Sequence, residues 1–315
     1  MNNLYYQVTL EFFEEQFIYK SAAQPDIDHL KLIFKNFIVL PEEIKKPVAT
    51  FLMSDCPNNQ YVRDVFDPLW GTMRIRHLVN GNWELWSQEN TAIPPLTISP
   101  LNKRFLVLHG CAIESRGNVF AFCGPSFAGK STLLLESINQ GAKAVSDDLV
   151  VIEFDHDNNP WVWKYPKPVG VRVPTLSVLP WLPSRFNKIP ADKKLFFPEQ
   201  DGRPATTITN LSDIFYEDVF IKNKKVRLNS LLILKRGFTG ISSINLSQGL
   251  AMLLRNTCNS GLDKIEVVRR CAQLINIVGV KMIGNDDVVA AARGLLSQNK
   301  EENDEQRSQV KFTNF

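Results

Sequence analysis

The chain contains 315 residues, of which 44% are hydrophobic and 22% are charged, and its formal net charge is +3. This composition is ordinary for a globular protein with a sizeable core, and it excludes a chain too polar to fold by itself. The small net charge and the lack of a strongly basic run give no reason to expect a nucleic-acid partner.

Cysteine and histidine usage indicates a reducing compartment and no zinc cluster. The five cysteines are scattered without a Cys-x-x-Cys pair, and the four histidines are also dispersed. No stretch reaches the ~18 apolar residues that a membrane helix needs. The first residues lack the basic and then apolar order of a signal peptide. We therefore expect a cytoplasmic protein with no membrane partner.

Residues 1–100 have the composition of a β-rich region, whose role the sequence does not define. The dipeptide Asn80-Gly81 separates two partly alternating runs, which predicts a hairpin because both turn residues need positive φ. Pro94, Pro95 and Pro100 remove backbone donors and stiffen the chain, so we expect a connector and a boundary near residue 100. The alternative is a single domain in which these strands extend the main sheet.

From residue 105 the pattern changes to strands that alternate with helices. The segments FLVLHGCAIES and NVFAFCG predict two apolar strands joined by a turn at Arg116-Gly117. The segment KSTLLLESINQ predicts a helix that ends near Gly141. The next segment, KAVSDDLVVIEFD, predicts a strand that two carboxylates interrupt.

The C-terminal part begins with a proline-rich, basic segment over 180–204. We expect it to be a long irregular loop, either functional or merely solvated. The elements predicted beyond it are strands over 230–237 and 279–284 and helices over 247–259, 263–278 and 285–298. Asn285 would cap the last helix. Residues 299–315 are too polar to pack and predict a tail, so the main domain is expected over 101–298.

The segment GPSFAGKS fits the phosphate-loop pattern G-x-x-x-x-G-K-[ST] in full and lies between a predicted strand and a predicted helix. Backbone amides and the helix N-terminus would present donors and a positive dipole to phosphate oxygens. Lys130 would supply a charge for the β- and γ-phosphates, and Ser131 a hydroxyl ligand for Mg²⁺. The predicted nucleotide-binding residues are Gly124, Pro125, Ser126, Phe127, Ala128, Gly129, Lys130, Ser131 and Thr132. We expect ATP and Mg²⁺ here; the alternative is a glycine turn without a ligand.

Two adjacent aspartates, Asp147 and Asp148, follow this loop in a strand of buried type. Carboxylates in such a strand are costly unless a cation pairs with them. In a regular strand the two side chains would point to opposite faces, so we expect one to serve the metal and the other to accept a proton from an attacking hydroxyl. Either one could instead be a structural cap or ion pair. Antiparallel pairing would bring His109 near the loop, in a structural or a functional role.

The stretch from Leu108 to Glu153 resembles the core of bacterial HPr kinase/phosphorylase, because a His-Gly turn, a phosphate loop and an Asp-Asp pair follow one another at similar spacing. That family shares its fold with phosphoenolpyruvate carboxykinase. The resemblance implies an α/β fold: a P-loop core of this type with a mixed sheet and flanking helices, plus a smaller β-rich N-terminal region.

The resemblance also implies roles for individual residues. Asp147 would be the acid/base, and Asp148 would assist the metal together with Ser131. His109 would lie near the transferred phosphoryl group, where it and Arg172 would stabilise charge. The family's Glu-Ile-Arg-Gly-type segment corresponds to YPKPVGVR here, which has no glutamate, and the family's phosphorylase loop is not recognisable. We therefore expect a kinase without the reverse activity.

The function predicted from these residues is transfer of the γ-phosphoryl group of ATP to a hydroxyl. The acceptor is expected to be a serine of a peptide or small protein; by analogy with similar enzymes, a lasso-peptide precursor is one example. The alternatives are a kinase of the same fold that acts on a small molecule such as free serine or a sugar, and a nucleotide-binding regulator without catalysis. An ABC-type ATPase is disfavoured because no Asp-Glu strand follows the NLSQGLA segment. The family often forms rings, so a homo-oligomer is one option.

Overall fold

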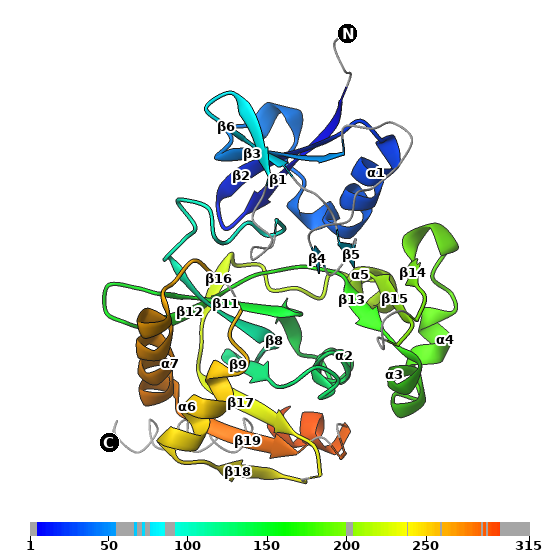
Figure 1. Ribbon diagram of the computed structural model, residues 1–315. Helices are drawn as coiled ribbons and strands as arrows, with labels where there is room; N and C mark the ends of the chain where they lie inside the picture. The colour runs from blue at the N-terminus through cyan, green and yellow to red at the C-terminus, as the bar shows by residue number, and fades with distance from the viewer. Residues whose placement is uncertain are drawn as a thin grey trace, which may run out of the picture. The chain divides into compact units, whose positions relative to one another are not determined.

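The computed structural model describes residues 5–54, 66–67, 71–72, 76–85, 92–199, 204–237, 239–258, 260–284, 286–287 and 289–296. The chain divides into two compact units, Met1–Phe105 with Asn259–Leu262 and Leu106–Cys258 with Asp263–Phe315 (Figure 1). The strands of the first unit form a sheet of their own and do not extend the large sheet of the second. The architecture is therefore a mixed α/β fold with a β-rich N-terminal region, as predicted.

The first unit is a five-stranded sheet in the order β1-β2-β3-β6-β7, with helix α1 packed on it. Its elements are β1 (Tyr6–Phe12), β2 (Glu15–Ser21), α1 (Gln24–Ile33), β3 (Ala49–Ser54), β6 (Arg76–Val79) and β7 (Asn82–Leu85), with a separate short pair β4 (Phe66–Asp67) and β5 (Gly71–Thr72). Strands β2 and β3 are parallel because α1 makes the crossover between them, whereas the other neighbours are antiparallel.

Aromatic side chains fill the core of this first unit. Phe17 and Tyr19 alternate on β2 and are fully buried, and the Tyr19 ring stacks on Phe51 at 5.2 Å between centroids. The predicted hairpin is confirmed, because Asn80 and Gly81 have φ values of 48° and 84° between β6 and β7.

The second unit is built on a nine-stranded mixed sheet in the order β16-β12-β11-β8-β9-β17-β19-β18, with β10 paired to β8. Its strands are β8 (Phe105–Ser115), β9 (Asn118–Cys123), β10 (Lys143–Ser146), β11 (Leu149–Phe154), β12 (Pro160–Trp163), β16 (Lys225–Arg227), β17 (Ser230–Lys235), β18 (Ile241–Ser243) and β19 (Val280–Gly284). Strand β17 runs parallel to both β9 and β19. The carboxyl ends of β9 and β17 therefore lie at one edge of the sheet.

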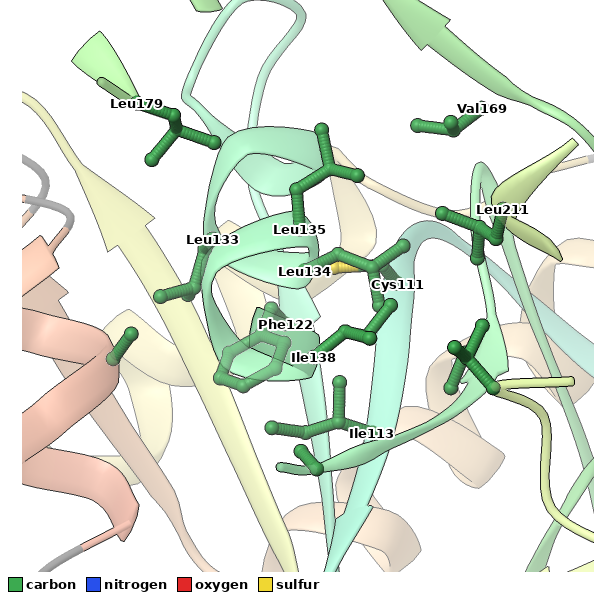
Figure 2. Close-up of a cluster of buried hydrophobic side chains, with 14 of the residues drawn as sticks. Cys111, Ile113, Phe122, Leu133, Leu134, Leu135, Ile138, Val169, Leu179 and Leu211 are labelled. Atoms are coloured by element: carbon green, nitrogen blue, oxygen red, sulfur yellow. The ribbon is translucent and has the colours of Figure 1, made fainter. Parts of the chain in front are cut away.

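Helices cover both faces of this sheet because side chains alternate along its strands. Cys111 and Ile113 of β8 pack with helix α2 (Lys130–Asn139), whereas Ala112 packs on the opposite side with helices α6 (Leu246–Leu254) and α7 (Lys264–Val278). Figure 2 shows side chains of α2 among Cys111, Ile113 and Phe122 of the sheet. Helix α2 is thus fixed by an apolar core.

The segment predicted as a long irregular loop over 180–204 is structured in its described part, so this expectation was wrong. It contains helix α4 (Leu182–Phe186), the turn Ala191–Lys193 and strand β14 (Leu195–Phe197). Pro183 lies in the first turn of α4, where its missing N–H costs nothing, and Leu182 and Phe186 are buried. The neighbouring elements are β13 (Val169–Val171), α3 (Val173–Val178), β15 (Thr206–Thr209) and α5 (Leu211–Phe215), and β13-β15-β14 form a small sheet.

The other predicted helices are present where the structure describes the chain, but the helix predicted over 247–259 ends at Leu254. Helix α7 begins after Asp263, whose side chain accepts a hydrogen bond from the Glu266 amide. Residues 289–296 are helical, whereas Asn285 and the predicted tail over 299–315 lie outside the described residues.

Candidate functional site

The glycine-rich loop, Gly124–Ser131, connects the carboxyl end of β9 to the N-terminus of α2. Gly129 has a φ of 86° directly before the helix, a conformation that favours glycine. A Cβ at Gly124 would lie 3.2 Å from the Cβ atoms of both Ala128 and Leu234, so the close approach to β17 favours glycine. The strand, loop and helix that the sequence predicts are therefore all present.

Lys130 is buried and its amine folds back onto the loop. Its Nζ donates hydrogen bonds to the carbonyl oxygens of Gly124 at 2.8 Å and Pro125 at 2.9 Å. Burial lowers the pKa of Lys130, although nearby thiols and the two aspartates oppose this shift. The amine is thus held where a phosphate on the loop would meet it.

Ser131 contacts Asp147 and not Asp148, which differs from the pairing expected from the sequence. The Ser131 hydroxyl donates to Asp147, with Oγ 3.1 Å from Oδ1 and 3.4 Å from Oδ2. Asp147 is 3% exposed, and burial, followed by repulsion from Asp148, raises its pKa to about 6. The ionised form of a buried carboxylate like this one is stabilised when a cation binds beside it.

Asp148 is turned away from Ser131 because it lies in the turn between β10 and β11, not within a continuous strand. Its φ of 70° breaks the strand alternation on which the sequence prediction depended. Its carboxylate forms an ion pair with Lys167, whose side chain is 13% exposed. Lys167 is the main cause that lowers the pKa of Asp148.

His109 lies beside the loop, as antiparallel pairing predicts, because its neighbour Gly110 pairs with Cys123 at the end of β9. Its Nδ1 is 3.1 Å from the backbone oxygen of Asp148 and 3.5 Å from Oδ1 of the same residue. Burial and, second, the charge of Lys130 lower the pKa of His109. The neutral imidazole is therefore favoured.

Arg172 follows β13 and lies over the loop. Its guanidinium carbon is 4.7 Å from the centroid of the Phe127 ring, and its Nε donates to Oγ1 of Thr206 at 2.9 Å. The charges of Asp147 and Asp148 act on its guanidinium. The structure thus brings Arg172 together with the loop and the aspartate pair.

Two cationic residues of this site, Lys167 and Arg236, were missed by sequence reasoning. Arg236 follows β17, and its Nη2 donates to the backbone oxygen of Phe127. The parallel pairing of β9 with β17 brings Arg236 to the loop, and a sequence does not reveal such pairing. Lys167 lies in the segment YPKPVGVR. The sequence signal there was the missing glutamate, which set this segment apart from the Glu-Ile-Arg-Gly-type segment of the family that the chain resembles.

Thr132 and Ala128 pack inward and do not line the loop surface. The Thr132 hydroxyl lies 3.3 Å from that of Thr175, and Ala128 is 1% exposed within the core cluster. Side-chain contact of these two residues with a nucleotide is therefore not expected. Phe127, by contrast, is 45% exposed at the outer part of the loop.

The residues at this site fit Mg²⁺ only together with a phosphate ligand. Within the ranges that the structure describes, no group of three or more His, Cys, Asp or Glu side chains could hold a metal ion. Ser131 and Asp147 supply two adjacent oxygen ligands, and Mg²⁺ commonly uses one or two carboxylates plus substrate phosphates. A metal that arrives with a nucleotide therefore matches this donor set.

Comparison with known proteins finds matches among solved structures. No family model matches the chain, and no curated protein does. The structure of the Hpr(Ser) kinase/phosphatase from Coxiella burnetii aligns with 66% of this chain and 98% of its own length, at 11% identity and a TM-score of 0.32. A likeness of this degree does not assign a function to the chain. Among the described helices, none combines the length and hydropathy needed to cross a membrane.

Proposed function

We propose that the protein is a kinase that transfers the γ-phosphoryl group of Mg-ATP to a hydroxyl group, with a serine of a peptide or small protein as the acceptor class. The observation that carries the proposal is the combination of a complete G-x-x-x-x-G-K-S loop with a buried carboxylate on its serine. A second carboxylate and a histidine lie beside that pair. A loop that only binds nucleotide would not require these additional groups.

Each part of the site would have a distinct task. The loop amides and Lys130 would bind the triphosphate, and Arg172 would stabilise charge on the transferred group. Ser131 and Asp147 would hold Mg²⁺, which when bound would neutralise charge on the phosphate oxygens. This assignment gives Asp147 the metal role that the family resemblance gave to Asp148, because the Ser131 hydroxyl contacts Asp147. The proton of the acceptor hydroxyl would go to a group beside this pair.

The experiment has a binding step and a transfer step. Calorimetry with ATP, in the presence of Mg²⁺ or of EDTA, measures whether nucleotide binds and whether the metal contributes. Incubation with γ-labelled ATP and a panel of serine-containing peptides, free serine and sugars then identifies the acceptor by mass spectrometry. We expect tighter binding with Mg²⁺ and label on a peptide.

The other outcomes distinguish the alternatives. Label on free serine or on a sugar would assign a small-molecule kinase of the same chemistry. Binding of Mg-ATP without transfer to any acceptor or to water would favour a nucleotide-binding regulator. A protein that does not bind ATP at all would contradict the proposal. A cytoplasmic location and a homo-oligomeric state remain predictions that this experiment does not address.

A further inference from the structure

We propose that Nε2 of His109 accepts the proton of the acceptor hydroxyl, and that Asp148 and Lys167 are positioning residues that hold the imidazole in this role. The inference rests on the proposed function, since it names the base of the same reaction. It replaces the expectation from the sequence that Asp147 is the base and that His109 stabilises phosphoryl oxygens.

The surroundings of the imidazole determine which ring nitrogen carries the hydrogen. Nδ1 lies 3.1 Å from the backbone oxygen of Asp148 and 3.5 Å from its Oδ1, and both oxygens can only accept when the carboxylate is ionised. Nδ1 is therefore the donor, and the neutral ring carries its lone pair on Nε2. Nε2 of such a ring cannot donate to a phosphoryl oxygen, but it can accept a proton.

The charges around the ring favour the neutral form that this role needs. Burial and Lys130 lower the pKa of His109, and Lys167 acts in the same direction more weakly. The carboxylate and the carbonyl of Asp148 oppose them. After proton transfer, the nearby Asp148 carboxylate would stabilise the imidazolium.

The backbone holds the ring in a fixed place. The amide of His109 donates to the Asn256 carbonyl at 2.7 Å, and the amide of Gly110 donates to the same Asp148 oxygen that accepts from the ring, at 3.2 Å. Gly110 also packs so closely that a Cβ there would lie 2.4 Å from the backbone oxygen of Phe122. The side chain of His109 is 34% exposed, so the ring is anchored on one edge and remains accessible to an acceptor.

Neither aspartate is as well placed to take the proton. The carboxylate of Asp148 forms an ion pair with Lys167, and protonation of Asp148 would remove that ion pair from a largely buried ammonium. Asp147 accepts the Ser131 hydroxyl and, in the proposed function, holds the metal. Of these three groups, the imidazole is the neutral base that neither an ammonium nor, in the proposed function, a metal engages.

The phosphoryl transfer needs no reactant other than ATP, the acceptor hydroxyl and the imidazole. The acceptor oxygen forms a bond to the γ-phosphorus while its proton moves to Nε2. The bond between the γ-phosphorus and the bridging oxygen breaks, and its electron pair leaves with ADP. The imidazolium then releases the proton to solvent from its exposed edge.

The test compares His109→Ala, His109→Asn and wild type for transfer from Mg-ATP to the acceptor found in the panel above, or to water if no acceptor is found. We expect His109→Ala to lose about 10²–10⁴-fold in turnover, the usual contribution of a general base, with ATP affinity within about twofold of wild type. Added imidazole should restore at least about tenfold of that loss. The matched control is His156→Ala, which replaces a histidine whose side chain is 88% exposed. It should keep wild-type turnover, and added imidazole should not change that turnover.

The asparagine variant separates a base from a structural anchor. His109→Asn can keep a donor near the position of Nδ1, and therefore the contact with Asp148, but it removes Nε2. We expect it to lose turnover as the alanine variant does. An active His109→Asn, or a His109→Ala that imidazole does not rescue, would overturn the inference while leaving nucleotide binding intact. A wild-type protein without any turnover would instead contradict the proposed function.

The positioning role of Lys167 has its own test. Lys167→Met leaves Asp148 without its ammonium partner and should lower turnover about tenfold or more, whereas Lys167→Arg keeps a cation there and should recover most of it. Equal activity in the two variants would show that the charge on Lys167 does not position the site. Thermal melting of both variants checks that each is folded.

Discussion

The amine of Lys130 is closed onto its own loop, with Nζ 2.8 Å from the carbonyl oxygen of Gly124. An incoming phosphate would replace contacts to neutral carbonyl oxygens with a charge-assisted one, which is the stronger kind of hydrogen bond. The Lys130 ammonium therefore has hydrogen-bond partners in the loop without a ligand, and it can exchange them for phosphate oxygens when a nucleotide binds.

This arrangement predicts that Lys130→Met will weaken Mg-ATP binding by about 10–100-fold, or about 1.4–2.7 kcal/mol, because a charge on the β- and γ-phosphates is lost. Calorimetry measures the change. Lys188→Met, on an exposed position of the second unit, removes the same charge away from the loop and should leave the affinity unchanged. Equal affinity in wild type and Lys130→Met would refute the placement of the triphosphate.

Replacement of Asp147 by asparagine should remove the contribution of magnesium to nucleotide binding. The amide oxygen can still accept from the Ser131 hydroxyl, so the local fold is retained, but it is a poor Mg²⁺ ligand. In wild type, ATP should bind more tightly with Mg²⁺ than with EDTA; in the variant this difference should shrink by about tenfold or more. If the difference persists, Asp147 does not hold the metal.

The raised pKa of Asp147 also predicts how the free energy of unfolding of the metal-free protein depends on pH. Burial raises its pKa from 3.8 to about 6, so the folded state favours the protonated form. The stabilisation from that proton is present below about pH 3.8 and is lost as pH rises to about 6. Wild type should therefore lose about 1–3 kcal/mol relative to Asp147→Asn across this range, measured by denaturant unfolding in EDTA. If the free energy of unfolding depended on pH in the same way in wild type and in Asp147→Asn, the raised pKa of Asp147 would be contradicted.

The sequence predicted the parts of the site that local patterns encode. The loop motif, the helix after it and the position of His109 follow from spacing and from antiparallel pairing of neighbouring strands. The side to which Asp148 points could not be predicted, because it depends on a φ of 70° in a turn. Arg236 reaches Phe127 only because β9 and β17, far apart in sequence, pair in parallel. Long-range pairing of this kind leaves no local signal.

Gly110 is expected to be indispensable beside His109. A Cβ there would lie 2.4 Å from the backbone oxygen of Phe122, so Gly110→Ala should destabilise the protein by about 1–3 kcal/mol and displace the imidazole. Thermal unfolding and turnover measure the two effects. Gly294→Ala is the control, because a Cβ at that helical position would meet no atom beyond its chain neighbours and its own helix backbone within 4 Å, and it should be neutral or stabilising. Similar behaviour of the two variants would contradict the close approach at Gly110.

Arg172 provides a test of geometry apart from charge. Its guanidinium is fixed both by the Phe127 ring, at 4.7 Å, and by the hydroxyl of Thr206. Arg172→Lys keeps the charge but loses the flat, stacked group, so turnover should fall about 10²-fold while ATP affinity changes less.

Arg185→Lys is the matched control for this change, because Arg185 also stacks on aromatic rings, at 5.2 Å from the centroid of Trp181 and 5.3 Å from that of Phe215. It lies in a different part of the second unit, on α4, and its replacement should leave turnover unchanged. If both variants lost turnover equally, the loss would reflect a general need for stacked arginines in the fold, and the specific role of Arg172 would be contradicted. If Arg172→Lys were fully active, a mobile charge over the loop would suffice, and the fixed guanidinium would have no part in the transfer.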